Sequence, residues 1–294
     1  MRGWWQWQDL TDLVLPAECG GCGRPRTVLC PECRAALSGA APSRVRPVPE
    51  PPGLPVVQAA ARYADEVRAV LLAHKERGAL ALAAPLGTAL AGAVRAGLTD
   101  RSGTVAVGGD RPVLLVPVPS ARGTVRARGH DPARRIALAA ASELRRTGTA
   151  ARVLAVLRQR RAVADQAGLN SRQRLDNLAG ALAVAPGGER LLHGGSVVLV
   201  DDLMTTGASL REAARAVHTA RAAETGLISY GEANTAVYAA AAREGTREQT
   251  AGSMDEGIGG RHSVPGKAGA GGPDDVIRAA VVAASPDSFE VNRN

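Results

Sequence analysis

The stretch Val197–Leu210, with the sequence VVLVDDLMTTGASL, limits the possible folds of this chain more than any other part of it. An apolar run rich in valine favours a buried strand. It leads into two adjacent carboxylates, Asp201 and Asp202, and then through a Thr-Thr-Gly turn into a helical pattern. A strand, turn and helix in this order indicate an α/β fold, in which ligands bind at the carboxyl ends of the strands.

The same stretch has the chemistry of a phosphate site. Backbone N–H groups at the start of a helix, together with the helix dipole, favour a bound dianion. The hydroxyls of Thr205, Thr206 and Ser209 add donors. Asp201 and Asp202 would accept hydrogen bonds from vicinal hydroxyls, as a ribose presents. The pattern G-x-x-x-x-G-K-[ST] of a Walker loop is absent. The alternative is a strand that simply ends in a capped turn.

Beyond residue 55, predicted strands alternate with predicted helices, which favours a mainly parallel sheet flanked by helices. The predicted elements are a strand ending near Tyr63, helices over Asp65–Arg77 and Ala79–Ala96, a buried strand over Pro112–Pro119, a helix over Asp131–Arg146, a strand over Ser196–Asp201, a helix over Ala208–Thr219 and a last strand over Val276–Ala284. In the predicted helix Asp131–Arg146, Asp131 is expected to be the N-cap and Pro132 the first helical residue.

The chain divides into three parts. Residues 1–37 hold all the cysteines and tryptophans, residues 38–55 are a Pro-rich linker, and residues 56–294 form the main domain. Within that domain, residues from about 222 to 274 lose periodicity. They are predicted to be an insertion, partly helical at 233–243 and otherwise disordered. Trp4, Trp5 and Trp7 are expected to pack the N-terminal segment against the main domain.

The four cysteines form two C-x2-C pairs, Cys19 with Cys22 and Cys30 with Cys33, separated by seven residues. This spacing suits tetrahedral thiolate ligation of Zn2+. The alternatives are two disulfides, which a reducing cytosol disfavours, or four free thiols. With four protein ligands the ion has no open coordination position. The predicted zinc module is therefore structural rather than catalytic.

Composition sets broad limits. Of 294 residues, 45% are hydrophobic and 22% charged, close to globular averages, while aromatics are only 2%. The core is therefore expected to consist of Ala, Val and Leu. The net charge of +8 favours phosphate-bearing ligands, either nucleic acid or phosphorylated metabolites; arginine replacing lysine on solvated faces is the alternative. No unbroken run of 18 apolar residues and no signal-peptide pattern are found. The prediction is a cytoplasmic protein without membrane insertion.

Val197–Leu210 closely resembles the phosphoribosyl pyrophosphate (PRPP) signature of type I phosphoribosyltransferases. In that family the paired acids hold the ribose hydroxyls and the following loop holds the 5′-phosphate. The resemblance implies a type I phosphoribosyltransferase-like α/β fold, a mainly parallel sheet flanked by helices, here with a small N-terminal zinc-binding module. It also implies a PRPP site made by consecutive residues: Asp201, Asp202, Leu203, Met204, Thr205, Thr206, Gly207, Ala208 and Ser209.

Over roughly residues 1–220 and 275–294, the chain resembles the ComF family of competence-associated phosphoribosyltransferase-like proteins. The shared features are the four-cysteine module, Tyr63 with the run Leu72–Gly78, the run Val116–Pro119, Arg126-x-Arg128-Gly129-His130, the set Arg161, Gln166, Leu169, Arg174 and Asn177, and the C-terminal strand with the tail 283–294. The predicted insertion at 222–274 is the clearest departure from that family.

The resemblance also assigns roles outside the signature. A pyrophosphate-binding loop and the basic residues after it would comprise Pro119, Ser120, Ala121, Arg122, Arg126 and Arg128; a solvated basic loop is the alternative. The polar segment Arg158–Asn177 matches a mobile loop that closes over the reaction centre, or it is a simple surface loop. Its Gln166 and Arg174 join Asp201 and Asp202 as candidate catalytic residues. Lys75 lies in the helix that matches the family; the alternative is that it belongs to an exposed, salt-bridging face of this helix.

The implied reaction uses PRPP with Mg2+. Pyrophosphate leaves C1 of the ribose as a nitrogen nucleophile of an unidentified acceptor attacks, and positioning and charge do most of the catalysis. The base-recognition hood is expected at about residues 56–100, with Tyr63 as its only aromatic residue. Two alternatives remain open. One is a PRPP-binding regulator without catalysis. The other is a DNA-uptake accessory protein that binds single-stranded DNA or a helicase partner.

Overall fold

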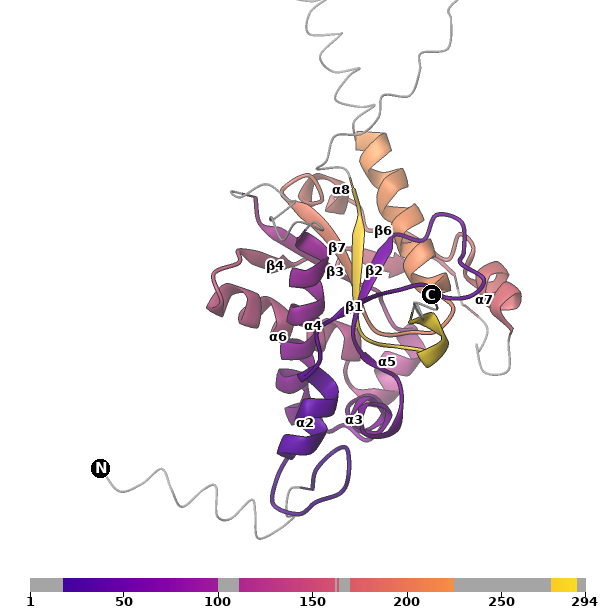
Figure 1. The fold of residues 1–294 in the computed structure, drawn as a ribbon. Helices are drawn as coiled ribbons and strands as arrows, with labels where there is room; N and C mark the ends of the chain where they lie inside the picture. The colour runs from indigo at the N-terminus through magenta and orange to yellow at the C-terminus, as the bar shows by residue number, and fades with distance from the viewer. Residues whose placement is uncertain (1–17, 100–110, 162, 164–169, 225–275, 290–294) are drawn as a thin grey trace, which may run out of the picture.

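A six-stranded sheet lies between two layers of helices (Figure 1). The computed structural model describes residues 18–99, 111–161, 163, 170–224 and 276–289. In spatial order the strands are β1 (Ser43–Val45), β2 (Val56–Arg62), β8 (Arg278–Ala284), β7 (Ser196–Met204), β3 (Val113–Pro117) and β4 (Ala151–Val153). β1 is antiparallel to β2, and the other neighbours in this sheet are parallel. The predicted mainly parallel α/β sheet is confirmed.

Both faces of the sheet are buried, as the unbroken apolar run of β7 predicts. Successive side chains of a strand alternate between the two faces. Val198 and Val200 accordingly pack into one core cluster, and Val197 and Leu199 into the other. The first cluster is completed by α2, α3, α4 and α6, and the second by the helix of residues 208–224.

The helices follow the chain in a regular order. They are α2 (Pro31–Ser38), α3 (Asp65–Glu76), the 3-10 turn η1 (Leu80–Leu82), α4 (Ala83–Leu98), α5 (Arg122–Arg128), α6 (Pro132–Arg146), α7 (Ser171–Leu178), α8 (Gly188–Leu191), the helix of residues 208–224, and the 3-10 turn η3 (Pro286–Ser288). A small antiparallel sheet is formed by β5 (Leu157–Gln159) and β6 (Leu182–Val184). It is tied to the 208–224 helix, since the Leu182 N–H donates to Glu212 Oε1 at 3.0 Å.

Most of the predicted helices are present. The predicted helix Asp65–Arg77 corresponds to α3, and Asp131 caps α6 by accepting a hydrogen bond from the Arg134 N–H at 3.2 Å. The predicted helix Ala79–Ala96 is divided into η1 and α4. The helix predicted to end at Thr219 continues to residue 224 among the described residues.

The strand that carries the acids runs further than predicted. The prediction ended it at Asp201, but β7 continues to Met204. Leu203 and Met204 still pair with Ala283 and Ala284 of β8, and the Met204 side chain is buried in the core. The two carboxylates are therefore held within a hydrogen-bonded ladder rather than in a free loop, which fixes their positions.

The N-terminal segments pack directly on the main domain. α2 buries Cys33 and Leu37 and contacts α3 and α4. The Pro-rich segment 38–55 contains the strand β1, which adds to the edge of the central sheet and was not predicted. Of the predicted insertion, residues 222–224 extend the preceding helix, and the remainder lies outside the described residues, as do the three tryptophans.

One helical stretch among the described residues, Leu80–Leu98, is long and apolar enough to cross a membrane by length and composition. The sequence analysis did not single out this stretch, because it counted only unbroken apolar runs. In the structure half of this stretch is buried. Leu86, Leu90 and Val94 belong to the core cluster between α4, α6 and the sheet. The apolar character of α4 is thus explained by its place in the core.

Candidate functional site

Asp201 and Asp202 lie near the carboxyl end of β7, between the parallel strands β3 and β8. The Asp202 side chain is buried, with 6% of the residue exposed, and Asp201 is partly buried. The Asp202 backbone N–H donates to Asp201 Oδ1 at 2.8 Å, which orients the first carboxylate. The two acids therefore stand at the edge of the sheet where α/β folds bind ligands.

Lys75, in the last turn of α3, forms an ion pair with the second acid. Its Nζ lies 2.8 Å from Asp202 Oδ2. Burial acts to lower the pKa of Lys75, but the charge and hydrogen bond of Asp202, with a contribution from Asp201, outweigh it and raise the pKa above its ordinary value. With about a third of its side chain exposed and a partner on another element, Lys75 does not lie on a solvated salt-bridging face. The structure places it in the site.

The first acid has a different electrostatic environment. Burial raises the pKa of Asp201 well above its ordinary value, and the neighbouring charge of Asp202 raises it further. The positive charge of Lys75 and the Asp202 N–H act in the opposite direction without cancelling the rise. The pair thus consists of one carboxylate matched by an ammonium and one whose ionisation is disfavoured until a ligand supplies further positive charge or hydrogen-bond donors.

The turn after β7 has a backbone that suits an anion. Gly207 has φ +74°, a left-handed conformation that L side chains rarely adopt, and a Cβ there would lie 3.0 Å from Leu54 Cδ1. The 208–224 helix starts directly after it, so its first N–H groups face the sheet edge. Thr205 and Ser209 line the cavity, whereas the side chains of Met204 and Ala208 are in the core.

The segment predicted to bind pyrophosphate follows β3. Pro119, Ser120 and Ala121 line the same cavity as the acids. Arg128, at the end of α5, also lines it, and its Nε donates to Glu76 Oε2 at 3.0 Å within a two-bond ion pair. Arg126 is exposed and is not among the described residues that line the cavity. For Arg122 the structure gives the backbone, as the first residue of α5.

The predicted mobile segment Arg158–Asn177 is regular at its two described ends. β5 lies at one end and α7 at the other, where Asn170 and Gln173 form a capping box. Arg174 Nη1 donates to Thr205 Oγ1 at 3.3 Å, so this segment reaches the turn after the acids. Gln166, the other candidate from this segment, lies outside the described residues.

These groups share one cavity of about 640 Å3. It is lined by residues from α3, the loop after β3, α5, the small sheet and the end of β7: Lys75, Val118, Pro119, Ser120, Ala121, Thr124, Arg128, Gln159, Val163, Leu178, Leu182, Asp201, Asp202, Leu203, Thr205 and Ser209. Among the polar lining residues, Lys75, Thr124 and Gln159 are those to which sequence reasoning gave no ligand role. Because they come from distant parts of the chain, only the fold brings them to the acids.

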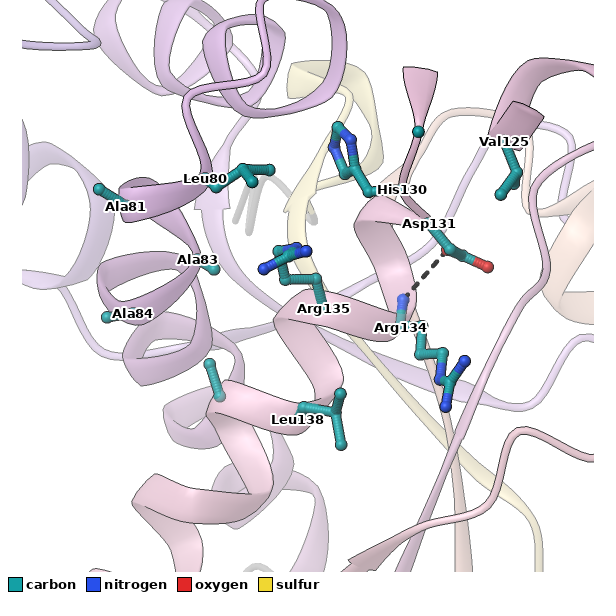
Figure 2. A pocket seen from close by; sticks show the side chains of 12 residues that line it. Leu80, Ala81, Ala83, Ala84, Val125, His130, Asp131, Arg134, Arg135 and Leu138 are labelled. Atoms are coloured by element: carbon teal, nitrogen blue, oxygen red, sulfur yellow. Dashed lines mark hydrogen bonds between the residues drawn. The ribbon is translucent and has the colours of Figure 1, made fainter. Parts of the chain in front are cut away.

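A second hollow, of about 740 Å3, lies between the N-terminal ends of α4 and α6 (Figure 2). It has leucine and alanine side chains on its walls, and Arg134 and Arg135 at its rim. It contains neither of the paired acids. Charge and hydrogen-bonding groups that suit a sugar phosphate are found in the first cavity, so that cavity is the candidate ligand site.

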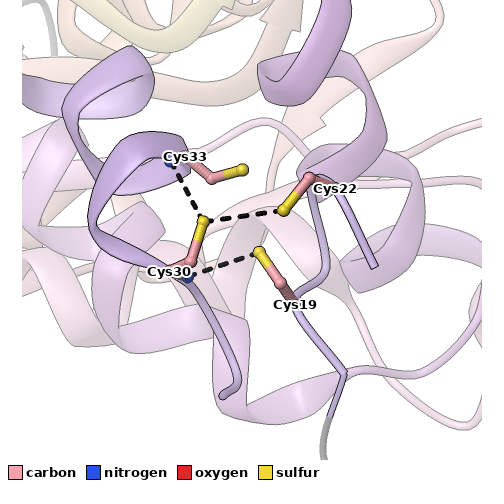
Figure 3. Close-up of side chains that lie close together, drawn as sticks. All are labelled: Cys19, Cys22, Cys30 and Cys33. Atoms are coloured by element: carbon pink, nitrogen blue, oxygen red, sulfur yellow. Dashed lines mark hydrogen bonds between the residues drawn. The ribbon is translucent and has the colours of Figure 1, made fainter. Parts of the chain in front are cut away.

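The four cysteines meet at one point beside α2 (Figure 3). Their Sγ atoms all lie within 4.8 Å of one another, and Cys22 Sγ and Cys30 Sγ are 3.6 Å apart. All four are free, so the pairs are not disulfides. With Zn–S bonds of about 2.3 Å, tetrahedral geometry places the sulfurs about 3.8 Å apart. The cluster therefore fits a structural zinc ion.

Backbone N–H groups support the cluster. The Cys30 N–H donates to Cys19 Sγ at 3.3 Å, and the Cys33 N–H donates to Cys30 Sγ at 3.5 Å. Burial acts to raise the pKa of Cys19, but the backbone N–H groups of Cys30, Cys22 and Gly21 outweigh it and lower the pKa to about 6. A thiolate is the form that binds the metal. Cys30 is also the N-cap of α2, so metal binding and the start of this helix are coupled.

A comparison with family models agrees with the fold and the site. The model of the phosphoribosyl transferase domain matches residues 133–252. This range contains all but the first residue of α6, and the whole of β7, the paired acids and the turn to the next helix. No curated protein matches the chain. Residues 133–252 thus match a phosphoribosyl transferase domain, for which PRPP is the implied ligand, and the four-cysteine cluster lies N-terminal to them.

Proposed function

We propose that the protein binds PRPP in the 640 Å3 cavity and transfers its phosphoribosyl group to a nitrogen atom of an acceptor. One observation carries this proposal: the paired acids and Lys75 line one cavity at the carboxyl edge of the sheet, together with Thr205 and Ser209 from the turn and helix that follow β7. Membership of the ComF family, which the sequence resemblance implies, is part of the same proposal. So is a cytoplasmic location.

Each part of PRPP has a matching part of the cavity. The 5′-phosphate binds to the N–H groups and hydroxyls of the turn after β7, where the helix dipole favours a dianion. The ribose hydroxyls donate to Asp201 and Asp202. The pyrophosphate lies against the loop Pro119–Ala121, with Arg128 beside it. Arg174, already in contact with Thr205, closes the phosphate end.

Lys75 has two states in this proposal. Without ligand it neutralises Asp202. When the pyrophosphate enters, Lys75 exchanges the carboxylate for a phosphate oxygen and stabilises the charge that develops on the leaving group. The ribose hydroxyls then take its place as hydrogen-bond donors to Asp202. The positive charge thus stays in the cavity and moves toward the atoms where negative charge develops.

Mg2+ fits the same place. Carboxylate and phosphate oxygens are its preferred ligands, and it usually binds through one or two carboxylates together with substrate phosphates. Asp201 and Asp202 are the described carboxylates that line the cavity. When bound, the ion neutralises the charge of the pyrophosphate. It would also favour ionisation of Asp201, whose pKa is raised without a ligand.

The test is isothermal titration of PRPP with Mg2+ into the zinc-loaded protein. We expect binding to the wild type and loss of binding in the double variant Asp201→Asn/Asp202→Asn. Asp287→Asn, an exposed position outside the cavity, is the matched control and should bind like the wild type. Absence of binding by the wild type would refute the proposal.

Pyrophosphate release, measured with a panel of nitrogenous acceptors, separates an enzyme from a regulator. Turnover with any acceptor supports transfer. PRPP binding without turnover supports a PRPP-responsive regulator on the same fold. A third arm titrates labelled single-stranded DNA at low salt; binding that falls steeply with added salt would favour the DNA-uptake alternative, because phosphate contacts release counterions.

A further inference from the structure

The 740 Å3 groove between α4 and α6 has no role in the proposed reaction. η1 and the first turn of α4 form one wall with Leu80, Ala81, Ala83 and Ala84, and α6 forms the other with Leu138 and Ala139 (Figure 2). Leu80 is 41% exposed and Leu138 is 52% exposed. Two leucines facing solvent across an alanine-lined hollow form an apolar surface that needs a cover.

The groove exists because the two helices diverge. At Gly87 they are in close contact, since a Cβ there would lie 2.4 Å from the Ala139 Cβ. Toward their N-terminal ends the walls separate, and α4 itself lines the hollow with the small side chains of Ala83 and Ala84. The result is a slot with apolar walls and two exposed arginines, Arg134 and Arg135, along one rim.

We propose that residues 1–17 of the same chain dock in this groove through their tryptophans. The described chain begins at Glu18, next to the cysteine cluster. Gly20 lies against Leu82 of η1, with 2.6 Å between its ideal Cβ position and Leu82 Cδ1. Leu82 is flanked in sequence by the lining residues Ala81 and Ala83. The N-terminal segment therefore starts beside one wall of the groove.

The composition of this segment matches the groove. It holds all three tryptophans of the chain, Trp4, Trp5 and Trp7, and the two acids Asp9 and Asp12. Indole rings bury large apolar areas and lie favourably beside arginine side chains. The acids complement the rim, where Arg134 and Arg135 outnumber the one acid, Asp131. A segment of this length, at up to about 3.5 Å per residue, reaches well past a groove whose α6 wall covers only Arg134–Ala139.

Docking here also bears on α5. This helix separates the groove from the ligand cavity: Val125 and Gly129 line the groove, while Thr124 and Arg128 line the cavity. A segment packed in the groove therefore braces the wall that carries Arg128. It covers apolar surface without entering the cavity itself.

Tryptophan fluorescence of the full-length protein tests the proposal, because all three indoles lie in the segment. We expect blue-shifted emission and slow quenching by acrylamide in the wild type. Leu138→Glu on the α6 wall and Ala84→Glu on the α4 wall should each shift the emission to longer wavelength and make quenching faster. Leu191→Glu, an equally exposed leucine on α8, is the control and should leave both unchanged.

Three results would overturn the proposal. The first is solvent-exposed emission in the wild type. The second is shielded emission that neither groove variant changes while both keep a cooperative unfolding transition. The third is shielding that disappears on dilution together with conversion of a dimer to a monomer, which would assign the groove to a second copy of the chain.

Discussion

Lys75 Nζ and Asp202 Oδ2 lie 2.8 Å apart and join the last turn of α3 to the carboxyl end of β7. The acid is almost fully buried, and the lysine reaches it from a helix whose apolar side chains belong to the core cluster on one face of the sheet. The ion pair therefore joins α3 to the end of β7. It also holds a positive charge inside the cavity that we propose for the ligand.

Removal of the lysine should destabilise the protein. Lys75→Met leaves the Asp202 carboxylate buried without its partner, which costs about 1.5–3 kcal/mol. The double variant Lys75→Met/Asp202→Asn should recover most of this loss, because the unpaired charge is gone. Urea unfolding at neutral pH measures both. Arg146→Met, which breaks the exposed pair with Glu143, is the control and should cost less than about 1 kcal/mol. A loss in the double variant as large as in the single one would argue against a charge effect.

The raised pKa of Asp201 predicts a pH-dependent stability. In the pH range between the unfolded-state pKa, about 3.9, and the raised folded-state value, the folded protein holds a proton that the unfolded chain has released. Stability therefore falls as pH rises through this range. Asp201→Asn removes the effect and keeps an acceptor for the Asp202 N–H. We expect the variant to be more stable than the wild type at pH 7 and equal to it near pH 3.

Unfolding free energies at several pH values measure this difference, and Asp287→Asn, at an exposed position, should show none of it. A variant less stable than the wild type at pH 7 would mean that the Asp201 carboxylate is ionised and favourably placed in the folded protein. The proton on Asp201 can also be followed by calorimetry. Binding of Mg2+ and PRPP should release it to the buffer. The observed binding heat should therefore depend on the ionisation enthalpy of the buffer.

The parts of the fold that sequence predicts well are those with strong local patterns. The Val-rich run before Asp201 predicts β7, and Asp131 with Pro132 predicts the start of α6. The spacing of the four cysteines predicts their convergence, which the structure confirms. In each case neighbouring residues carry the whole signal, and no distant contact is needed to interpret it.

The parts that were missed depend on distant contacts. β7 extends to Met204 because β8 continues beside it, and β1 exists because β2 offers a free edge. A lysine in an amphipathic helix carries no local sign that its partner is an acid on β7, so Lys75 could not be assigned from its helix. Counting only unbroken apolar runs did not single out Leu80–Leu98, although its length and mean hydropathy are those of a helix that could cross a membrane.

Gly207 should be intolerant of a side chain. Gly207→Ala forces an L residue into a left-handed conformation, at a cost of about 1–2 kcal/mol, and places its Cβ against Leu54. The turn that follows Asp202 would shift, so PRPP affinity should fall together with stability. Gly92→Ala, inside α4 with only an ordinary contact to Pro42, is the control and should be neutral or stabilising by up to about 1 kcal/mol. Unchanged PRPP affinity in Gly207→Ala would remove the turn from the binding site.

The cysteine cluster should hold about one zinc ion per chain, and its loss should reach the ligand site. α2 begins at the cluster, with Cys30 as its cap, and Leu37 of α2 is buried in the core cluster that includes α3. A strong chelator, or Cys33→Ser, should cost several kcal/mol, because structural zinc contributes folding energy directly. At about 2–4 °C per kcal/mol, the unfolding temperature falls by roughly 10 °C. Since α3 carries Lys75, PRPP affinity should fall as well.

Metal analysis measures the zinc content and thermal unfolding measures the loss of stability, with the exposed α2 variant Ser38→Ala as control. A protein that loses its zinc but keeps its unfolding temperature would show that packing of Leu37 alone holds α2 in place.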